Sequence, residues 1–241
     1  MQKLRVSTST SSHYFHEQLK KSGLYQVHSI FNSSFNIVNQ EMTFLNINQN
    51  LETLSAIGLM IEKDVFQKIL KAIKVNDVVK LDNNKIIFYT SSNPLLLELV
   101  TIDLFNPYPI TVNPMVFSHL LNLNNLQYDP LLNNRELTFQ QRVGRGTGFT
   151  PSGDDFNWGY MMILSLFNQQ LPSLVITKTT LISQSIYDRL YQEQWGWIYV
   201  QLFQSSIPQI QIDSLMTYGH TSGQDTLFGM KCALEDLKNR K

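Results

Sequence analysis

Two segments of the chain share the pattern Ser-Gly-x-Asp-x-x-x-Gly, and each leads directly into an apolar stretch with helical periodicity. The first reads "SGDDFNWG" (residues 152–159) and the second reads "SGQDTLFG" (residues 222–229). Glycine inside a helix costs up to about 1 kcal/mol relative to alanine, and close contact with a second helix is the usual compensation. We therefore predict that two helices cross near Gly159 and Gly229, with their N-termini directed toward one crevice.

The region in front of the first pattern, "GRGTG" (residues 144–148), is rich in glycine. A helix N-terminus offers unpaired N–H groups and a partial positive charge, which suit an anion. A glycine-rich loop can add a nest of further N–H donors, and Arg142 and Arg145 can pair with phosphate or carboxylate. The sequence thus predicts a small-anion site whose substrate-binding residues are Arg145, Gly146, Thr147, Gly148, Thr150, Ser152, Gly153, Ser222 and Gly223.

The glycine-rich loop differs from two common phosphate-binding motifs. A Walker A loop is excluded because no Gly-Lys-Ser/Thr follows. A dinucleotide fingerprint is excluded because the third glycine of "GRGTGF" comes one residue early and no clear strand precedes it.

Acidic residues at the two helix starts allow more than one interpretation. Asp155 and Asp225 could complete capping boxes with Ser152 and Ser222, and Asp154 could complement the helix dipole. Alternatively, Asp154 or Asp155 binds Mg²⁺ together with substrate oxygens, which would reconcile a carboxylate with an anionic ligand. A histidine in the loop before the second helix could donate to an anion or act as a general acid. The candidate catalytic residues are therefore Asp154, Asp155, His220 and Asp225.

Composition excludes some classes of partner. Nineteen basic residues balance nineteen acidic ones, which argues against nucleic-acid or membrane-surface binding, since both need a basic face. No apolar run approaches the roughly 18 residues of a membrane span, and no apolar stretch typical of a signal peptide follows the N-terminus. The single cysteine, Cys232, reads as a small buried residue. We expect a cytoplasmic protein.

Hydrophobic periodicity changes near residue 112. Runs rich in β-branched and aromatic residues dominate before it, with a tight hairpin at Asn83-Asn84 and one helix beginning near Asp64. Asn113-Pro114 then signals a helix start. The predicted fold class is α+β, with a hydroxyl-rich, frayed N-terminal arm and short helix at 1–22, a β-rich domain at 23–112 and a helical domain at 113–241. Helices are expected at 114–127, 130–142, 153–169, 179–194, 197–204, 212–218 and 223–239, whereas the run at 95–105 fits strand or helix.

The two glycine patterns also resemble those of a known family. This is the AllH family, the H subunit of oxamate carbamoyltransferase in anaerobic allantoin breakdown. Its hallmark motif resembles G-x-G-x-G-[LF]-T-P-S-G-D-D-x-x-x-G, which this chain matches at residues 144–159. The family's second motif, G-H-[ST]-S-G-x-D, is matched at residues 219–225, and a Thr-Thr-x-x-Ser segment at Thr179, Thr180 and Ser183 is similar too. Phe149 stands where leucine is commoner. The specific resemblance covers about the last 100 residues.

The resemblance implies transfer of a carbamoyl group between carbamoyl phosphate and oxamate, giving oxalurate and phosphate, or the reverse. It also implies partner subunits, one of them similar to acyl-CoA synthetases and another from the chain's own family. Two other functions stay open: a non-catalytic metabolite-binding or assembly subunit, and a transferase acting on a different small anion.

Overall fold

A computed structural model describes residues 1–106, 108 and 111–239. The chain divides into two compact units, Met1–Pro107 and Tyr108–Lys241, which we describe in turn. Among the described residues, no helix combines the length and apolar character needed to cross a bilayer.

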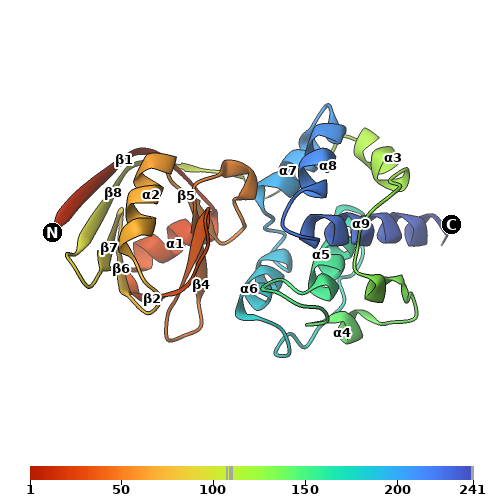
Figure 1. Ribbon diagram of the computed structural model, residues 1–241. Helices are drawn as coiled ribbons and strands as arrows, with labels where there is room; N and C mark the ends of the chain where they lie inside the picture. The colour runs from red at the N-terminus through yellow and green to blue at the C-terminus, as the bar shows by residue number, and fades with distance from the viewer. Residues whose placement is uncertain (107, 109–110, 240–241) are drawn as a thin grey trace. The chain divides into compact units, whose positions relative to one another are not determined.

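The first unit is a closed eight-stranded barrel with two helices (Figure 1). Around the barrel the strands follow the order β1-β5-β4-β3-β2-β6-β7-β8, with parallel pairing at β1–β8 and β4–β5 and antiparallel pairing elsewhere. The elements are β1 (Gln2–Ser11), α1 (His13–Lys21), β2 (Gly23–Ile30), β3 (Ser34–Val38), β4 (Phe44–Asn48), η1 (Leu51–Thr53), β5 (Gly58–Met60), α2 (Lys63–Ala72), β6 (Val78–Asp82), β7 (Lys85–Tyr89) and β8 (Leu95–Leu104).

Closure of this barrel corrects the predicted fold class. The α+β prediction placed a β-rich half after a frayed arm, but the hydroxyl-rich start is strand β1, which pairs in parallel with β8 from Gln2↔Leu95 to Ser11↔Leu104. Periodicity indicates which face of a strand is buried, not which strand lies beside it. A pairing between the first and last strands therefore could not be inferred from local sequence.

Local signals in the barrel were more informative. Asn83 has a φ of 56° in the two-residue turn between Asp82 and Lys85, which confirms the predicted hairpin. The helix predicted to begin near Asp64 is α2, which begins one residue earlier with Glu62 as its N-cap and whose buried residues are Val65, Phe66 and Ile69. The run at 95–105, left open by the sequence, is β8.

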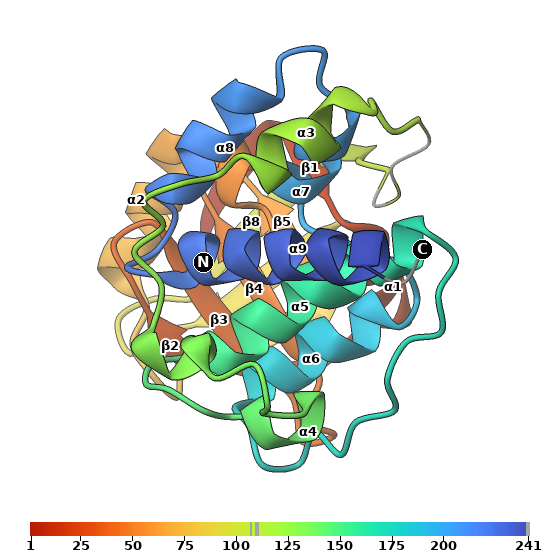
Figure 2. The ribbon, with the colours of Figure 1, turned by 90° about the vertical axis from the view of Figure 1, so that its right-hand side faces the viewer.

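The second unit is helical. Its elements are α3 (Met115–Leu121), η2 (Pro130–Asn133), α4 (Phe139–Arg142), α5 (Ser152–Leu166), α6 (Leu181–Leu190), α7 (Trp197–Gln204), α8 (Pro208–Met216) and α9 (Ser222–Asn239). The helix predicted at 130–142 is wrong, because the segment is a short 3-10 turn followed by irregular chain and the single turn α4. Figure 2 shows α9, in dark blue, lying across α5.

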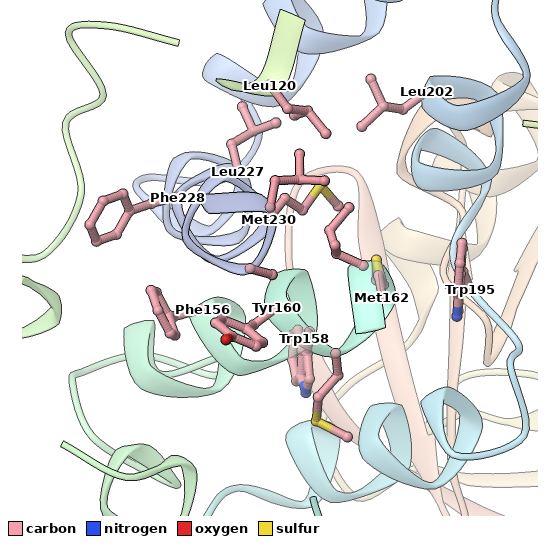
Figure 3. Close-up of a cluster of buried hydrophobic side chains, with 14 of the residues drawn as sticks. Leu120, Phe156, Trp158, Tyr160, Met162, Trp195, Leu202, Leu227, Phe228 and Met230 are labelled. Atoms are coloured by element: carbon pink, nitrogen blue, oxygen red, sulfur yellow. The ribbon is translucent and has the colours of Figure 1, made fainter. Parts of the chain in front are cut away.

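Helix α5 is the centre of this unit, since every residue from Ser152 to Leu164 is buried. A helix that is buried all round has no polar stripe, and this one packs on α9 through aromatic and sulfur-containing side chains (Figure 3). Phe156 of α5 meets Phe228 of α9 edge to face, with ring centroids 5.6 Å apart. Cys232 is buried in the same core, as predicted. The two glycine patterns thus begin the two most closely packed helices of the unit.

Candidate functional site

The crossing of α5 and α9 is built on the predicted pair of glycines. A Cβ atom at Gly159 would overlap the carbonyl oxygen of Thr226, and a Cβ atom at Gly229 would overlap that of Phe156. The two contacts are equivalent, because each glycine faces the residue three positions before the other glycine. The prediction that the helices cross at Gly159 and Gly229 is confirmed.

Two further glycines, Gly153 and Gly223, allow the start of each helix to pack closely against the backbone of the preceding segment. A Cβ atom at Gly153 would overlap the carbonyl oxygen of Arg142, and one at Gly223 would overlap that of Leu215. The N–H of Gly153 donates to the Arg145 carbonyl at 2.9 Å, and the N–H of Gly223 donates to the Tyr218 carbonyl at 3.1 Å. Both N–H groups that we expected to face a ligand are thus used within the chain.

The capping-box interpretation fails at the first helix start. The N-cap of α5 is Pro151, and no side chain caps that helix. At the second start, Oδ1 of Asp225 accepts from the N–H of Asp129 at 2.9 Å and so binds a distant loop. A capping box does occur between Thr138 and Gln141 of α4, where the sequence analysis did not place one.

Asp154 lies at the centre of a buried hydrogen-bond network and is 0% exposed. Its Oδ1 accepts from the N–H of Gly144 at 3.0 Å and from the hydroxyl of Tyr187 at 3.1 Å. Its Oδ2 accepts from the hydroxyl of Thr179. Both carboxylate oxygens therefore have donors from the protein, which leaves Asp154 poorly suited to bind Mg²⁺ as well.

Asp155 and Asp225 form the acidic pair at the crossing, and they are 2% and 0% exposed. In each carboxyl group Oδ2 has no hydrogen-bond donor among the described residues. Burial raises the pKa of Asp155 well above its usual range, the Ser222 hydroxyl opposes this rise, and the charges of Asp225 and Asp154 add to it. Burial also raises the pKa of Asp225, although the N–H of Asp129 and the Ser152 hydroxyl oppose that rise.

Hydroxyl groups from both helix starts surround this pair. The hydroxyl oxygens of Thr150 and Ser222 are 2.9 Å apart and half-buried, and both lie close enough to Asp155 to stabilise its charged form. The arrangement is reciprocal, since the hydroxyl of Ser152, at the start of α5, stabilises charge on Asp225 of α9.

The glycine loop, residues 144–150, folds over the start of α5. Positive φ values recur at alternate residues, 72° at Gly144, 104° at Gly146 and 95° at Gly148, as in an anion-binding nest. A Cβ atom at Gly146 would come within 2.8 Å of the Ser152 nitrogen. The N–H groups of Gly146, Thr147 and Gly148 donate to no backbone carbonyl in the part of the chain that the structure describes. Residues 145–149 are exposed.

The two arginines of this region have different environments. Arg145 is exposed on the glycine loop, where its guanidinium can reach a ligand. Arg142 is 6% exposed, lies 4.5 Å above the ring of Phe156 and donates to the Asn134 carbonyl at 3.1 Å. Burial lowers the pKa of Arg142. Arg145 is therefore the candidate for substrate binding, and Arg142 belongs to the core.

His220 is exposed on the turn that leads into α9. Among the described residues, no group of three or more His, Cys, Asp or Glu side chains could hold a metal ion. If a cation binds here, the oxygens best suited to it are Oδ2 of Asp155 and Oδ2 of Asp225, since neither has a donor among the described residues.

Sequence reasoning did not identify several polar residues around the carboxylates. Tyr187 and Thr179 bind Asp154, and Tyr199 and Tyr218 lie near Asp155, whose charge adds to the effect of burial in raising their pKa values. The family-like Thr-Thr-x-x-Ser segment was a signal for Thr179. For the tyrosines the sequence held no such signal, because each reaches the site from another helix or loop.

A separate cleft of about 330 Å³ lies between α3 and α8. It is lined by Ser118, His119, Asn122, Leu123, Asn124, Gln209, Ile212, Asp213 and Met216. None of these residues belongs to the glycine patterns, so this cleft is distinct from the candidate site.

Comparison with known protein families gives a match to part of the chain. The model of the family described as oxamate carbamoyltransferase subunit AllH matches residues 142–234. No curated protein and no solved structure matches the chain significantly. The matched segment begins at the end of α4 and includes the glycine loop, both glycine-pattern helix starts and the α5–α9 crossing. Residues 142–234 are thus AllH-like, which confirms the resemblance inferred from the two motifs.

Proposed function

We propose that this chain is a subunit of an oxamate carbamoyltransferase-type complex and that it binds a small anionic substrate, carbamoyl phosphate or oxamate, at the glycine loop. The observation that carries the proposal is the AllH match over residues 142–234, because these residues contain the whole of the candidate site. The match supports a subunit of this enzyme. The substrate and its site are inferred from the chemistry of the loop.

The glycine loop has the properties of a phosphate or carboxylate site. It offers the N–H groups of Gly146, Thr147 and Gly148, which have no backbone acceptors among the described residues, at the positive end of α5. Arg145 is exposed on the same loop and adds a full positive charge with a planar set of donors. Thr150 and Ser222 add hydroxyl groups at the inner edge.

The chemistry requires a base and stabilisation of negative charge. The amide nitrogen of oxamate attacks the carbonyl carbon of carbamoyl phosphate, a C–N bond forms, the C–O bond to phosphate breaks, and the nitrogen loses one proton. Positioned N–H groups stabilise the departing phosphate. We assign the proton to the deprotonated carboxylate of Asp155, reached through the hydroxyl of Ser222 or Thr150, with Asp225 sharing the site. Burial raises the pKa of Asp155, which makes its carboxylate form a stronger base. His220, exposed at the rim, is the candidate acid for the phosphate.

The complex would include further chains. We expect an acyl-CoA synthetase-like subunit and a second subunit of the same family, as the resemblance implies. As a cofactor, Mg²⁺ bound by Asp155 together with substrate oxygens is consistent with the unpaired Oδ2 of that residue.

A non-catalytic role is the alternative, as a metabolite-binding or assembly subunit. One observation favours it: Gly153, Gly223 and Asp154 all have partners within the chain, so part of the motif serves folding. The variant Asp155→Asn separates the two roles. Loss of turnover with folding and assembly intact supports the catalytic proposal, whereas dissociation of the complex supports the assembly role.

The first experiment is the thermal unfolding midpoint of the purified chain with carbamoyl phosphate, oxamate, oxalurate, phosphate and Mg²⁺, singly and in pairs. A ligand at about 100 times its dissociation constant adds about 2.7 kcal/mol, which raises the midpoint by roughly 5–10 °C for a chain of this size. We expect a rise with carbamoyl phosphate that Arg145→Ala abolishes. A midpoint that no ligand changes, repeated with the partner subunits present, would refute the anion site.

A further inference from the structure

We infer that Asp154, Thr179 and Thr180 are positioning residues that hold the two ends of the glycine loop in its ligand-ready conformation, a role that rests on the proposed anion site. From the sequence alone, Asp154 was a candidate catalytic residue. The contacts of its carboxylate instead direct it toward the loop and helix α6.

The first end of the loop is held at Gly144. Its N–H donates to Oδ1 of Asp154 at 3.0 Å. Its φ of 72° lies in the left-handed region, and a Cβ atom there would overlap the carbonyl oxygen of Lys178. The loop therefore starts in a conformation that needs glycine, packed against the residue that precedes Thr179.

The carboxylate that holds Gly144 is itself held by side chains of α6 and of the segment that leads into it. The hydroxyl of Thr179 donates to Oδ2 of Asp154, and the hydroxyl of Tyr187 donates to Oδ1 at 3.1 Å. Nδ2 of Asn157 donates to the Tyr187 hydroxyl at 3.1 Å, which orients that group. Burial raises the pKa of Tyr187, so the phenol keeps its proton and remains a donor.

The second end of the loop is held by the next threonine. The hydroxyl of Thr180 donates to the Phe149 carbonyl at 2.5 Å and accepts from the N–H of Ser183 at 3.2 Å, where it caps α6. Consecutive side chains, Thr179 and Thr180, thus connect one rigid helix start to opposite ends of the loop.

The middle of the loop has little hydrogen bonding of its own. Among the described residues, the N–H groups of Gly146, Thr147 and Gly148 find no backbone acceptor. Three glycines make this segment conformationally free when it is not restrained. Its shape is consequently set by the contacts at its ends, and an anion that binds these N–H groups would bind more weakly if either end were released.

The test compares Thr179→Val, which removes the hydroxyl at similar volume, with Thr179→Ser, which retains it. Amide hydrogen exchange of residues 144–150 and the dissociation constant for inorganic phosphate are measured on the full chain, and exchange in the barrel strands serves as the internal reference. A hydrogen bond to a charged group is worth roughly tenfold or more in an equilibrium constant. We expect Thr179→Val to speed exchange at Gly144 and to weaken phosphate binding, each by about tenfold, with Thr179→Ser within about twofold of wild type.

The outcomes separate this inference from the proposed function. Unchanged loop exchange in Thr179→Val refutes the positioning role, whatever the phosphate result. Faster loop exchange in Thr179→Val, with exchange near the wild-type rate in Thr179→Ser, supports the positioning role. If the wild-type chain also binds no phosphate, even with its partner subunits, the anion site is refuted while the positioning role stands. If Thr179→Val does not fold, Tyr187→Phe removes the second side-chain donor to Asp154 while keeping the ring, and the same two measurements apply.

Discussion

Gly159 and Gly229 occupy equivalent places in the crossing of α5 and α9, each against a carbonyl oxygen of the opposite helix. The contact explains why glycine stands two turns inside both helices despite its poor helix propensity. The sequence pattern that contains them therefore has a structural role at its second glycine, apart from any ligand bound at its start.

We expect Gly159→Ala to lower the free energy of unfolding by about 2–3 kcal/mol, because a methyl group must displace the Thr226 carbonyl and the loss exceeds the gain in helix propensity. All three tryptophans lie in the helical unit, so their fluorescence during urea unfolding reports on it. As a control, Gln204→Ala, at an exposed position of α7, should change the free energy of unfolding by less than about 0.5 kcal/mol. Equal stability of Gly159→Ala and wild type would contradict the close crossing.

Burial of Asp155 makes stability depend on pH. Its pKa is raised in the folded protein, so between the unfolded and folded pKa values the native state holds a proton that the unfolded state has lost. Stability then falls as pH rises through this window, by about 1.4 kcal/mol per pH unit for one such group. We expect Asp155→Asn to flatten this slope and to be more stable than wild type at pH 7.

The pH measurement has a matched control in Asp188→Asn, since Asp188 is exposed on α6. Unfolding midpoints of both variants and wild type are compared from pH 4 to pH 8. Asp225, whose pKa burial also raises, adds a slope of its own. A slope in Asp155→Asn as steep as that of wild type would contradict the raised pKa of Asp155.

The exposed Arg145 should act on ligand affinity and not on stability. Removal of one charged contact to an anion costs about 1.5–3 kcal/mol, so Arg145→Ala should raise the phosphate or carbamoyl phosphate dissociation constant roughly tenfold or more. Its unfolding midpoint should stay within about 1 °C of wild type. Isothermal titration at two salt concentrations checks the first expectation, because a charged contact at the surface weakens with salt. Unchanged affinity would remove Arg145 from the site.

Arg142 should show the opposite behaviour. Its side chain is buried above Phe156 and donates to the Asn134 carbonyl. We expect Arg142→Ala to cost about 2–4 kcal/mol of unfolding free energy, through lost packing and an unsatisfied carbonyl. Circular dichroism and urea unfolding measure this. A fully stable Arg142→Ala chain that no longer binds phosphate would reverse the assignments of the two arginines.

Some features of the protein followed from short stretches of sequence. The glycine spacing predicted the α5–α9 crossing, Asn83 predicted the β6–β7 hairpin, and the apolar periodicity after Asp64 predicted α2. Each depends on backbone conformation or on the period of one element, both of which neighbouring residues largely determine. The AllH resemblance of residues 142–234 was likewise carried by contiguous motifs.

Only the tertiary structure decided the rest. Barrel closure depends on the pairing of β1 with β8. Asp154, which the sequence suggested as a catalytic residue, instead binds the glycine loop, and Thr179 and Tyr187 from elsewhere in the chain donate to its carboxylate. Asp155 and Asp225 look like capping residues in sequence, yet burial at a helix crossing gives them unpaired oxygens and raised pKa values. Strand partners, burial and hydrogen-bond donors are set by residues far apart in the chain, and no local pattern contains that information.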